Sequence, residues 1–162
     1  MLIRAAQRDD VPALLEISNE AAETTIANFA TEPESLADWQ AQFDSAAPRH
    51  AWFVAERGGA VAGFARSGPW KSRGAYDRTA EVSVYVQPTA QHCGVGRALY
   101  TKLLQTLRSR ELDLLLAGIA LPNAASVRLH ESFGFEPCAR FERIGFKFGA
   151  WHDVGYWSLR LR

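Results

Sequence analysis

Alternation of apolar and polar positions marks residues 79–87 most clearly as a β-strand. Val82, Val84 and Val86 occupy every second position there, so one face of the strand is apolar, and Pro88 ends the run. The segment over 112–120 is almost wholly apolar, which is typical of a strand buried on both faces. Further strands are expected at residues 2–4, 52–56, 60–66, 138–148 and 154–160. A polar loop is expected at 67–78.

Apolar spacings of three and four predict four helices among these strands. The first follows Asp9 and Asp10, which we expect at the N-cap, with Pro12 in the first turn. Ser35 precedes the second, whose apolar stripe includes Trp39. The other two are expected over 94–110 and 124–133. This order of elements predicts a mixed α/β domain around one sheet.

Composition narrows the classes of protein that remain. The 162 residues correspond to one domain at roughly 100–200 residues per domain, and 18 Lys plus Arg balance 18 Asp plus Glu. Zero net charge disfavours nucleic acid as a partner. No signal-peptide core and no run of ~20 apolar residues is seen, so we expect no membrane segment and a cytoplasmic location.

The two cysteines are expected to be reduced. Cys93 and Cys138 lack the spacing of a zinc site, so no metal is expected. Cys138 is expected to be buried. Cys93 has no His or Asp partner by spacing, which disfavours a covalent acyl-enzyme and favours direct transfer in a ternary complex.

A glycine-containing loop over 91–98 lies between the strand at 79–87 and the helix after it. Two glycines let successive N–H groups point inward, and the helix start adds its dipole, an arrangement that suits a pyrophosphate. Arg97 adds a positive charge. The Walker A pattern fails because Arg97 and Ala98 follow Gly96, and the dinucleotide fingerprint fails because Leu99 stands where Gly or Ala is needed. A helix start without a ligand is the alternative.

The loop resembles the Gln/Arg-x-x-Gly-x-Gly/Ala motif of the GCN5-related N-acetyltransferases (GNAT), with Gln91, Gly94 and Gly96 at the matching positions. The Asn123 turn and the segment 133–135 also resemble that family. The resemblance implies the GNAT fold: a central, mostly antiparallel mixed sheet, flanked by helices, with a V-shaped splay between the strands at 79–87 and 112–120. It implies one acetyltransferase domain over 1–162 and acetyl-CoA as co-substrate.

Four segments are similar to the phosphinothricin and methionine sulfoximine N-acetyltransferase branch: 28–33, 68–76, 79–86 and 145–155. This resemblance implies acetyl transfer to the α-amino group of a small amino acid or analogue, and a homodimer. The coenzyme-binding residues that it implies, some through the main chain, are Val84, Val86, Gln91, His92, Gly94, Val95, Gly96, Arg97, Ala98, Asn123 and Ser126.

Glu81 is the candidate general base, because a carboxylate in an otherwise apolar and hydroxylated strand is costly unless solvated or paired. The alternative is an exposed carboxylate paired with Arg78. His130 is the candidate acid for the leaving thiolate, and a packed helix histidine is its alternative. Tyr85 is a second candidate acid.

Lys71 and Arg73 are the candidate clamp for the acceptor's carboxylate, unless they belong to a solvated loop. Phe29, Trp70 and Tyr76 are expected to wall the acceptor pocket. Lys147 is a further candidate, which could reach a site from a partner chain.

Two other functions remain open. The same chemistry could act on a polyamine, an aminoglycoside or a protein N-terminus, but a polycation needs an acidic pocket and the loop at 71–78 is basic. A non-catalytic acyl-CoA-binding module is disfavoured by Glu81 and His130 beside an intact loop.

Overall fold

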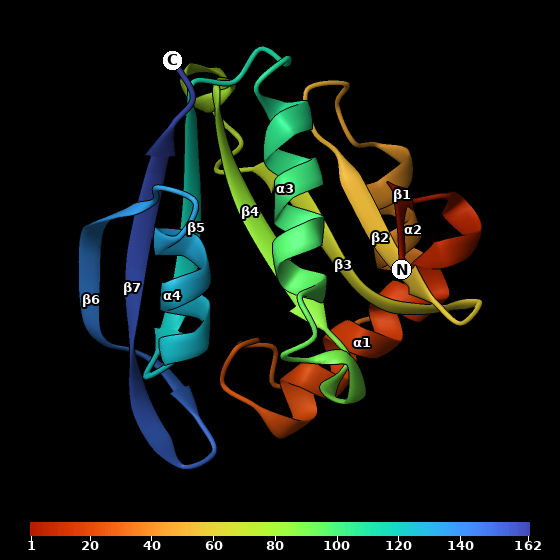
Figure 1. Cartoon of the computed structure of the whole chain (residues 1–162). Coiled ribbons are helices and arrows are strands. Elements are labelled where there is room, and N and C mark those ends of the chain that lie inside the picture. Colours follow the sequence, from red (N-terminus) through yellow and green to blue (C-terminus); the bar gives the residue numbers. More distant parts are fainter.

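Seven strands form one twisted sheet in this computed structural model, which describes residues 1–162 (Figure 1). The strand order is β1-β2-β3-β4-β5-β7-β6, and every neighbouring pair is antiparallel except β4 and β5. The strands are β1 (Leu2–Ala5), β2 (Trp52–Arg57), β3 (Ala60–Pro69), β4 (Thr79–Val86), β5 (Leu114–Leu121), β6 (Glu136–Lys147) and β7 (Ala150–Arg160). The expected mixed, mostly antiparallel sheet is thereby confirmed.

The parallel pair β4 and β5 separates after three residue pairs. Thr79 faces Leu114 and Glu81 faces Leu116, after which no pairing follows although both strands continue. Figure 1 shows the two strands diverging toward the bottom of the view. The V-shaped splay expected from the resemblance is confirmed.

Helices cover both faces of the sheet: α1 (Val11–Thr24), α2 (Leu36–Asp44), α3 (Val95–Leu107) and α4 (Ala124–Glu131). Leu99, Leu103 and Leu107 of α3 are fully buried in a cluster of 21 core residues. A second cluster of 8 residues contains Leu14 of α1 and Trp39 of α2. The sheet therefore separates two cores, as the leucine stripe of α3 and the apolar periodicity of α1 and α2 require. No helix combines the length and apolar character that a membrane crossing needs.

Several boundaries differ from the sequence expectation because pairing partners extend or shorten the strands. β3 continues to Pro69, which pairs with Ala80 of β4, so it takes in part of the expected loop. The main chain of Asp113 bonds back to Arg78, and β5 therefore begins at Leu114. The expectation that this strand is buried on both faces is wrong at Gly118, which is exposed where the sheet has opened.

The expectation of a buried Cys138 is also wrong. Cys138 lies on the edge strand β6, which is exposed along most of its length, and its thiol is free and exposed. The apolar run alone could not distinguish an edge strand from a central one. β6 begins two residues earlier than expected, at Glu136, and β7 begins four residues earlier, at Ala150, where it pairs with Lys147 of β6.

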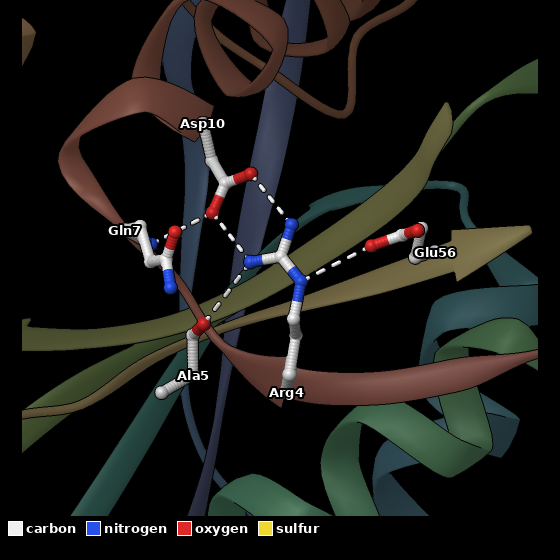
Figure 2. Close-up of polar contacts among 5 residues, drawn as sticks. All are labelled: Arg4, Ala5, Gln7, Asp10 and Glu56. Carbon is white, nitrogen blue, oxygen red and sulfur yellow. Dashed lines mark hydrogen bonds and ion pairs between the residues drawn. The ribbon is translucent and has the colours of Figure 1, made fainter. Parts of the chain in front are cut away.

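An ion-pair network fixes the start of α1 on the sheet (Figure 2). Asp10 stands at the N-cap position as expected, but its side chain makes no cap hydrogen bond to α1. Its carboxylate instead accepts from Arg4 of β1 at 2.7 and 2.8 Å and from the Gln7 N–H at 2.7 Å. Arg4 also donates to Glu56 of β2 at 3.1 Å. The Arg4 hydrogen bond lowers the pKa of Asp10, although its burial opposes this.

Replacing Asp10 tests this network. Asp10→Ala is expected to lower the free energy of unfolding by about 1–3 kcal/mol at pH 7, because it removes charge-assisted bonds and leaves Arg4 with one carboxylate partner. The folded pKa of Asp10 lies below its ordinary value of 3.8. Its stabilisation is therefore complete above that value and is lost as the pH falls through the folded pKa. Urea unfolding at pH 7 and at about pH 2 measures both effects.

Asp44→Ala is the matched control, since Asp44 makes an exposed pair with Arg8 at 3.1 Å. Such a pair contributes about 0–1 kcal/mol. Equal losses in the two variants at pH 7 would contradict the role of the Arg4 network.

Candidate active site

The two faces of β4 divide the candidate residues into two groups. Glu81, Ser83 and Tyr85 line a cavity on the side of α1 and α2. Val82, Val84 and Val86 pack toward α3 on the other face. The carbonyl of Arg78 bonds to the start of β5, so by alternation the N–H and C=O groups of Val82, Val84 and Val86 also face the splay. This edge can take an extended ligand as if it were another strand.

The loop before α3 has the conformation of an anion-binding helix start. His92 and Gly94 adopt left-handed backbone conformations with φ of 58° and 80°, and Gly94 caps the helix. The first ladder bond runs from Ala98 N–H to Gly94 O at 3.0 Å. The N–H groups of Val95, Gly96 and Arg97 therefore precede the ladder and point out of the helix start.

Two side chains attach this loop to its surroundings. Gln91 donates to the Val86 carbonyl at 3.2 Å, which joins the loop to the open end of β4. Arg97 donates to Ser132 at 3.2 Å and lies over the ring of Phe133. The main-chain donors face outward, so the arrangement fits a pyrophosphate, with Gln91 acting as a brace.

Asn123 and Ser126 begin α4 on the far side of the splay. The Asn123 side-chain oxygen caps the helix by accepting from the Ser126 N–H at 3.1 Å. Its Nδ2 makes no hydrogen bond within the chain and is free to donate. Asn123 therefore has a structural role that the sequence did not indicate, and retains one donor for a ligand.

His130 lies in the packed core between α3 and α4 and does not line the cavity. Its Nδ1 donates to the Ser126 carbonyl at 2.8 Å, so Nε2 accepts the hydroxyl of Tyr100, also at 2.8 Å. Burial lowers the pKa of His130, against the effect of the Ser126 carbonyl, and keeps the ring neutral. Both nitrogens are engaged, as in the packed-histidine alternative.

A cavity of ≈770 Å³ opens between α1, α2 and the sheet. Of the expected acceptor residues, Phe29 and Tyr76 line it, together with Glu81 and Tyr85. Trp70 does not line it and packs edge-on against Tyr156 at 5.2 Å. Lys71 and Arg73 are exposed and lie outside the lining. The carboxylate and part of the aromatic wall thus come together, while the expected cationic clamp lies apart from them.

Glu81 is half-buried at the cavity wall. Its removal from water raises the pKa of the carboxyl, and the positive charge of Arg66 partly opposes that rise. Arg78, the alternative partner, pairs instead with Asp113 at 2.5 Å. A carboxylate with a raised pKa in a cavity is suited to accept a proton from an amine.

The loop at 25–34 forms the opposite wall, and contacts from distant parts of the chain fix it in place. The Tyr85 hydroxyl donates to the Ala27 carbonyl at 3.3 Å. Phe29 lies so close to Gly145 of β6 that an added Cβ there would come within 2.2 Å of its ring. The position of Phe29 in the cavity therefore depends on the hairpin of β6 and β7.

Lys147 of β6 holds the same loop from within its own chain. The residue is 6% exposed, and its ammonium group donates to the main-chain carbonyls of Ala22, of Thr25 at 3.1 Å and of Asn28 at 2.6 Å. Burial lowers the pKa of Lys147. The charge caps the negative end of the α1 dipole. These contacts occupy all three N–H donors, which argues against reach into a partner's site.

Lys147→Met should release this loop. We expect the free energy of unfolding to fall by about 1–3 kcal/mol, because buried and partly buried carbonyls lose their donor. Proteolytic cleavage within 25–34 should become faster. Lys102→Met, which removes an exposed lysine of α3, is the control. Cleavage at unchanged rates in the Lys147 variant would show that the loop is held by other contacts.

Arg66 and His50 are among the cavity residues that escaped the sequence analysis. Arg66 lies on β3, and burial lowers the pKa of His50. Arg66 carried a usable signal: it is a charged side chain in an otherwise apolar strand, the same signal that identified Glu81. Nothing in the sequence around His50 indicated a cavity.

The site combines an open edge of β4, an anion-binding helix start beside that edge, and a partly buried carboxylate on the same strand. This combination defines an enzyme that transfers a group from a phosphate-bearing carrier. Residues 12–135 match the acetyltransferase (GNAT) family model. The chain belongs to this family.

Relatives agree over nearly the whole chain. The phosphinothricin N-acetyltransferase of Streptomyces viridochromogenes is 43% identical over 96% of this chain and 85% of its own length. The L-methionine sulfoximine/L-methionine sulfone acetyltransferase of Salmonella typhimurium is 36% identical over 99% and 95%. A solved putative acetyltransferase from Salmonella typhimurium with its cofactor acetyl-CoA superposes with a TM-score of 0.94 at 35% identity, covering 99% and 94%.

Proposed function

We propose that this protein transfers the acetyl group of acetyl-CoA to the α-amino group of a small amino acid or analogue, such as phosphinothricin or methionine sulfoximine. The relatives named for these acceptors, and the solved relative with acetyl-CoA, support the proposal. The observation that carries it is the position of Glu81, whose carboxylate faces the cavity from the strand whose edge is left open by β5.

The coenzyme would lie along the splay. The main chain of Val84 and Val86 offers strand-like hydrogen bonds to its pantetheine arm, and Asn123 offers Nδ2 from the other side. The amides at the start of α3 would receive the pyrophosphate, through the N–H groups of Val95, Gly96 and Arg97. This arrangement brings the thioester end toward the part of β4 that carries Glu81.

Glu81 would accept a proton from the acceptor amine, directly or through water. The amine nitrogen then forms the new C–N bond, and the C–S bond of the thioester breaks. Binding both substrates in one site supplies up to ~7–11 kcal/mol in ideal cases. Neither free thiol lines the cavity, which supports direct transfer within a ternary complex.

The leaving thiolate needs a proton. Tyr85 lines the cavity, and burial raises the pKa of its hydroxyl, so it stays protonated. His130 has both nitrogens engaged in the core. We therefore assign the acid to Tyr85 and give His130 the role of holding α4 on α3.

Lys71 and Arg73 remain candidates for the acceptor's α-carboxylate. They follow Pro69, which lines the cavity, and neither side chain has a hydrogen-bonded partner within the chain. Lys71 lies over the ring of Trp70 at 5.2 Å. From there both can close on the cavity mouth once a substrate is bound.

Glu81→Gln tests the base. Loss of the proton acceptor should lower kcat by about 100-fold or more, with little change in the KM for acetyl-CoA, measured by thiol release. In the native enzyme kcat should rise with pH as Glu81 ionises. This limb lies above the range of an ordinary carboxyl, since burial raises the pKa, and it should be absent from the variant.

Glu34→Gln is the control, because Glu34 is a second carboxylate lining the same cavity. The Glu34→Gln variant should retain the rise of kcat with pH that the native enzyme shows. A Glu81→Gln variant with normal kcat would remove Glu81 from the base role.

We also propose that residues 1–162 form one acetyltransferase domain, supported by a sheet that takes strands from both ends of the chain. A cytoplasmic location is supported by the two free, exposed thiols.

We propose in addition that the protein forms a homodimer. The proposal is supported by an apolar surface on the hairpin of β6 and β7, where five large side chains are 47–59% exposed: Phe141, Ile144, Phe146, Phe148 and Trp151. Phe146 and Trp151 pack edge to face at 5.3 Å, and exposed apolar clusters are typical of interfaces.

Substitution of this surface should separate the protomers. The double variant Phe146→Ser/Trp151→Ser is expected to sediment as a monomer at concentrations where the native chain is a dimer. Leu2→Ser removes a side chain of similar exposure, 55%, at the opposite edge of the sheet, and should leave the dimer intact. A native chain that sediments as a monomer would contradict the proposal.

A further inference from the structure

Arg66 is the cation of the cavity whose charge is not paired with a carboxylate. No carboxylate oxygen lies within 4.0 Å of its guanidinium, whereas Arg49, which lines the same cavity, pairs with Asp77 at 3.4 Å. Glu34 and Glu81 also line the cavity and act on Arg66 only at longer range. Burial lowers the pKa of Arg66, so its charge is poorly solvated.

The guanidinium lies over two aromatic rings that meet edge to face. Its central carbon lies 4.5 Å from the ring of Trp39 and 4.6 Å from that of Trp52. One N–H donates to Gln42 at 3.2 Å. A guanidinium has five N–H donors, so most of them remain for a ligand. A stacked, partly desolvated fork of this kind favours bidentate binding of an oxyanion.

Arg66 and Glu81 stand at offset positions along the sheet. In the sheet Arg66 pairs with Ser83, and Glu81 pairs with Gly68, so both side chains leave the same face. The guanidinium then turns away from β4, toward Trp52 of β2 and Trp39 of α2. An acceptor whose amine is at Glu81 would therefore present the far end of its side chain to Arg66, since its α-carboxylate is only one carbon from the amine.

We propose that Arg66 binds an anionic group at the end of the acceptor's side chain and selects such acceptors over neutral ones. The inference rests on the proposed function and narrows it. The favoured class is an amino acid whose side chain ends in a phosphinate or carboxylate. A sulfone or a carboxamide of the same length gives the guanidinium no charge to bind.

The test compares acceptors of matched shape and different charge. Phosphinothricin is set against methionine sulfone, and L-glutamate against L-glutamine, with kcat/KM measured for each. Arg66→Gln should lower kcat/KM for the preferred anionic acceptor about 10- to 100-fold, with a much smaller effect on its neutral counterpart. If Arg66→Gln reduces the preference for the anionic acceptor more in the phosphinothricin pair, the site takes a phosphinate. If the reduction is greater in the glutamate pair, the site takes a carboxylate.

Two further variants separate selectivity from folding. Arg66→Lys keeps the charge without the planar fork and should retain part of the preference, and thermal unfolding of each variant reports any loss of packing on Trp39. Arg49→Gln removes a positive charge that is already paired at the same cavity, and should change both members of a pair equally. An equal fall for anionic and neutral acceptors in Arg66→Gln would overturn the inference.

A binding measurement distinguishes failure of the proposed function from failure of the Arg66 inference. Calorimetric binding of the four acceptors to the native protein and to Arg66→Gln needs no turnover. Arg66-dependent binding of an anionic acceptor without acetylation would contradict the acetyltransferase proposal and sustain the anion site. Acetylation that does not depend on Arg66 would sustain the acetyltransferase proposal and contradict the anion site. If the protein neither acetylates these acceptors nor binds them through Arg66, both proposals are contradicted.

Discussion

The structure depends above all on the separation of β4 from β5. Three paired residues hold the two strands together, and beyond Glu81 the main-chain groups on one edge of β4 face no strand. Backbone donors and acceptors need partners, so an edge opened inside a sheet is a binding feature that the fold must support from elsewhere. β5 is held on its other side by eight pairs with β7, from Leu114 to Leu121, which lets it diverge without loss of its own ladder.

The same strand supplies both halves of the site because its side chains alternate. Valines on one face join the core under α3, whose first turn presents its amides at the end of the strand. Glu81 and Tyr85 on the other face enter the cavity. A carrier bound along the edge and an acceptor bound in the cavity would therefore meet at β4, with no further element needed to bring them together. Burial of Glu81 in this wall raises the pKa of its carboxyl. The same desolvation that makes the carboxylate unfavourable there makes it a stronger proton acceptor.

The rest of the cavity is assembled from distant parts of the chain. Lys147, near the C-terminus, fixes the end of α1 and the loop after it through three carbonyls. Gly145 leaves the space that Phe29 occupies, and Arg66 depends on two tryptophans from different elements. The acceptor side is thus a product of tertiary packing, whereas the carrier side is a local strand–loop–helix unit. Such a division lets acceptor selectivity change while the carrier site stays the same.

Sequence alone determined what neighbouring residues decide. The alternation over 79–87, the leucine stripe of α3 and the glycines at 94 and 96 gave the strand, the helix and the anion-binding start, because periodicity and backbone freedom are local properties. Glu81 was found by its charge in an apolar strand. Which side chains share a cavity was decided only in three dimensions. Lys71 and Arg73 are close to the site in sequence and lie outside the cavity lining, while Arg66 was overlooked and lies within it. His130 and Lys147 show the same limit, since a charge or ring can serve the core or the ligand. The partners that decide between these roles are up to 125 residues away along the chain.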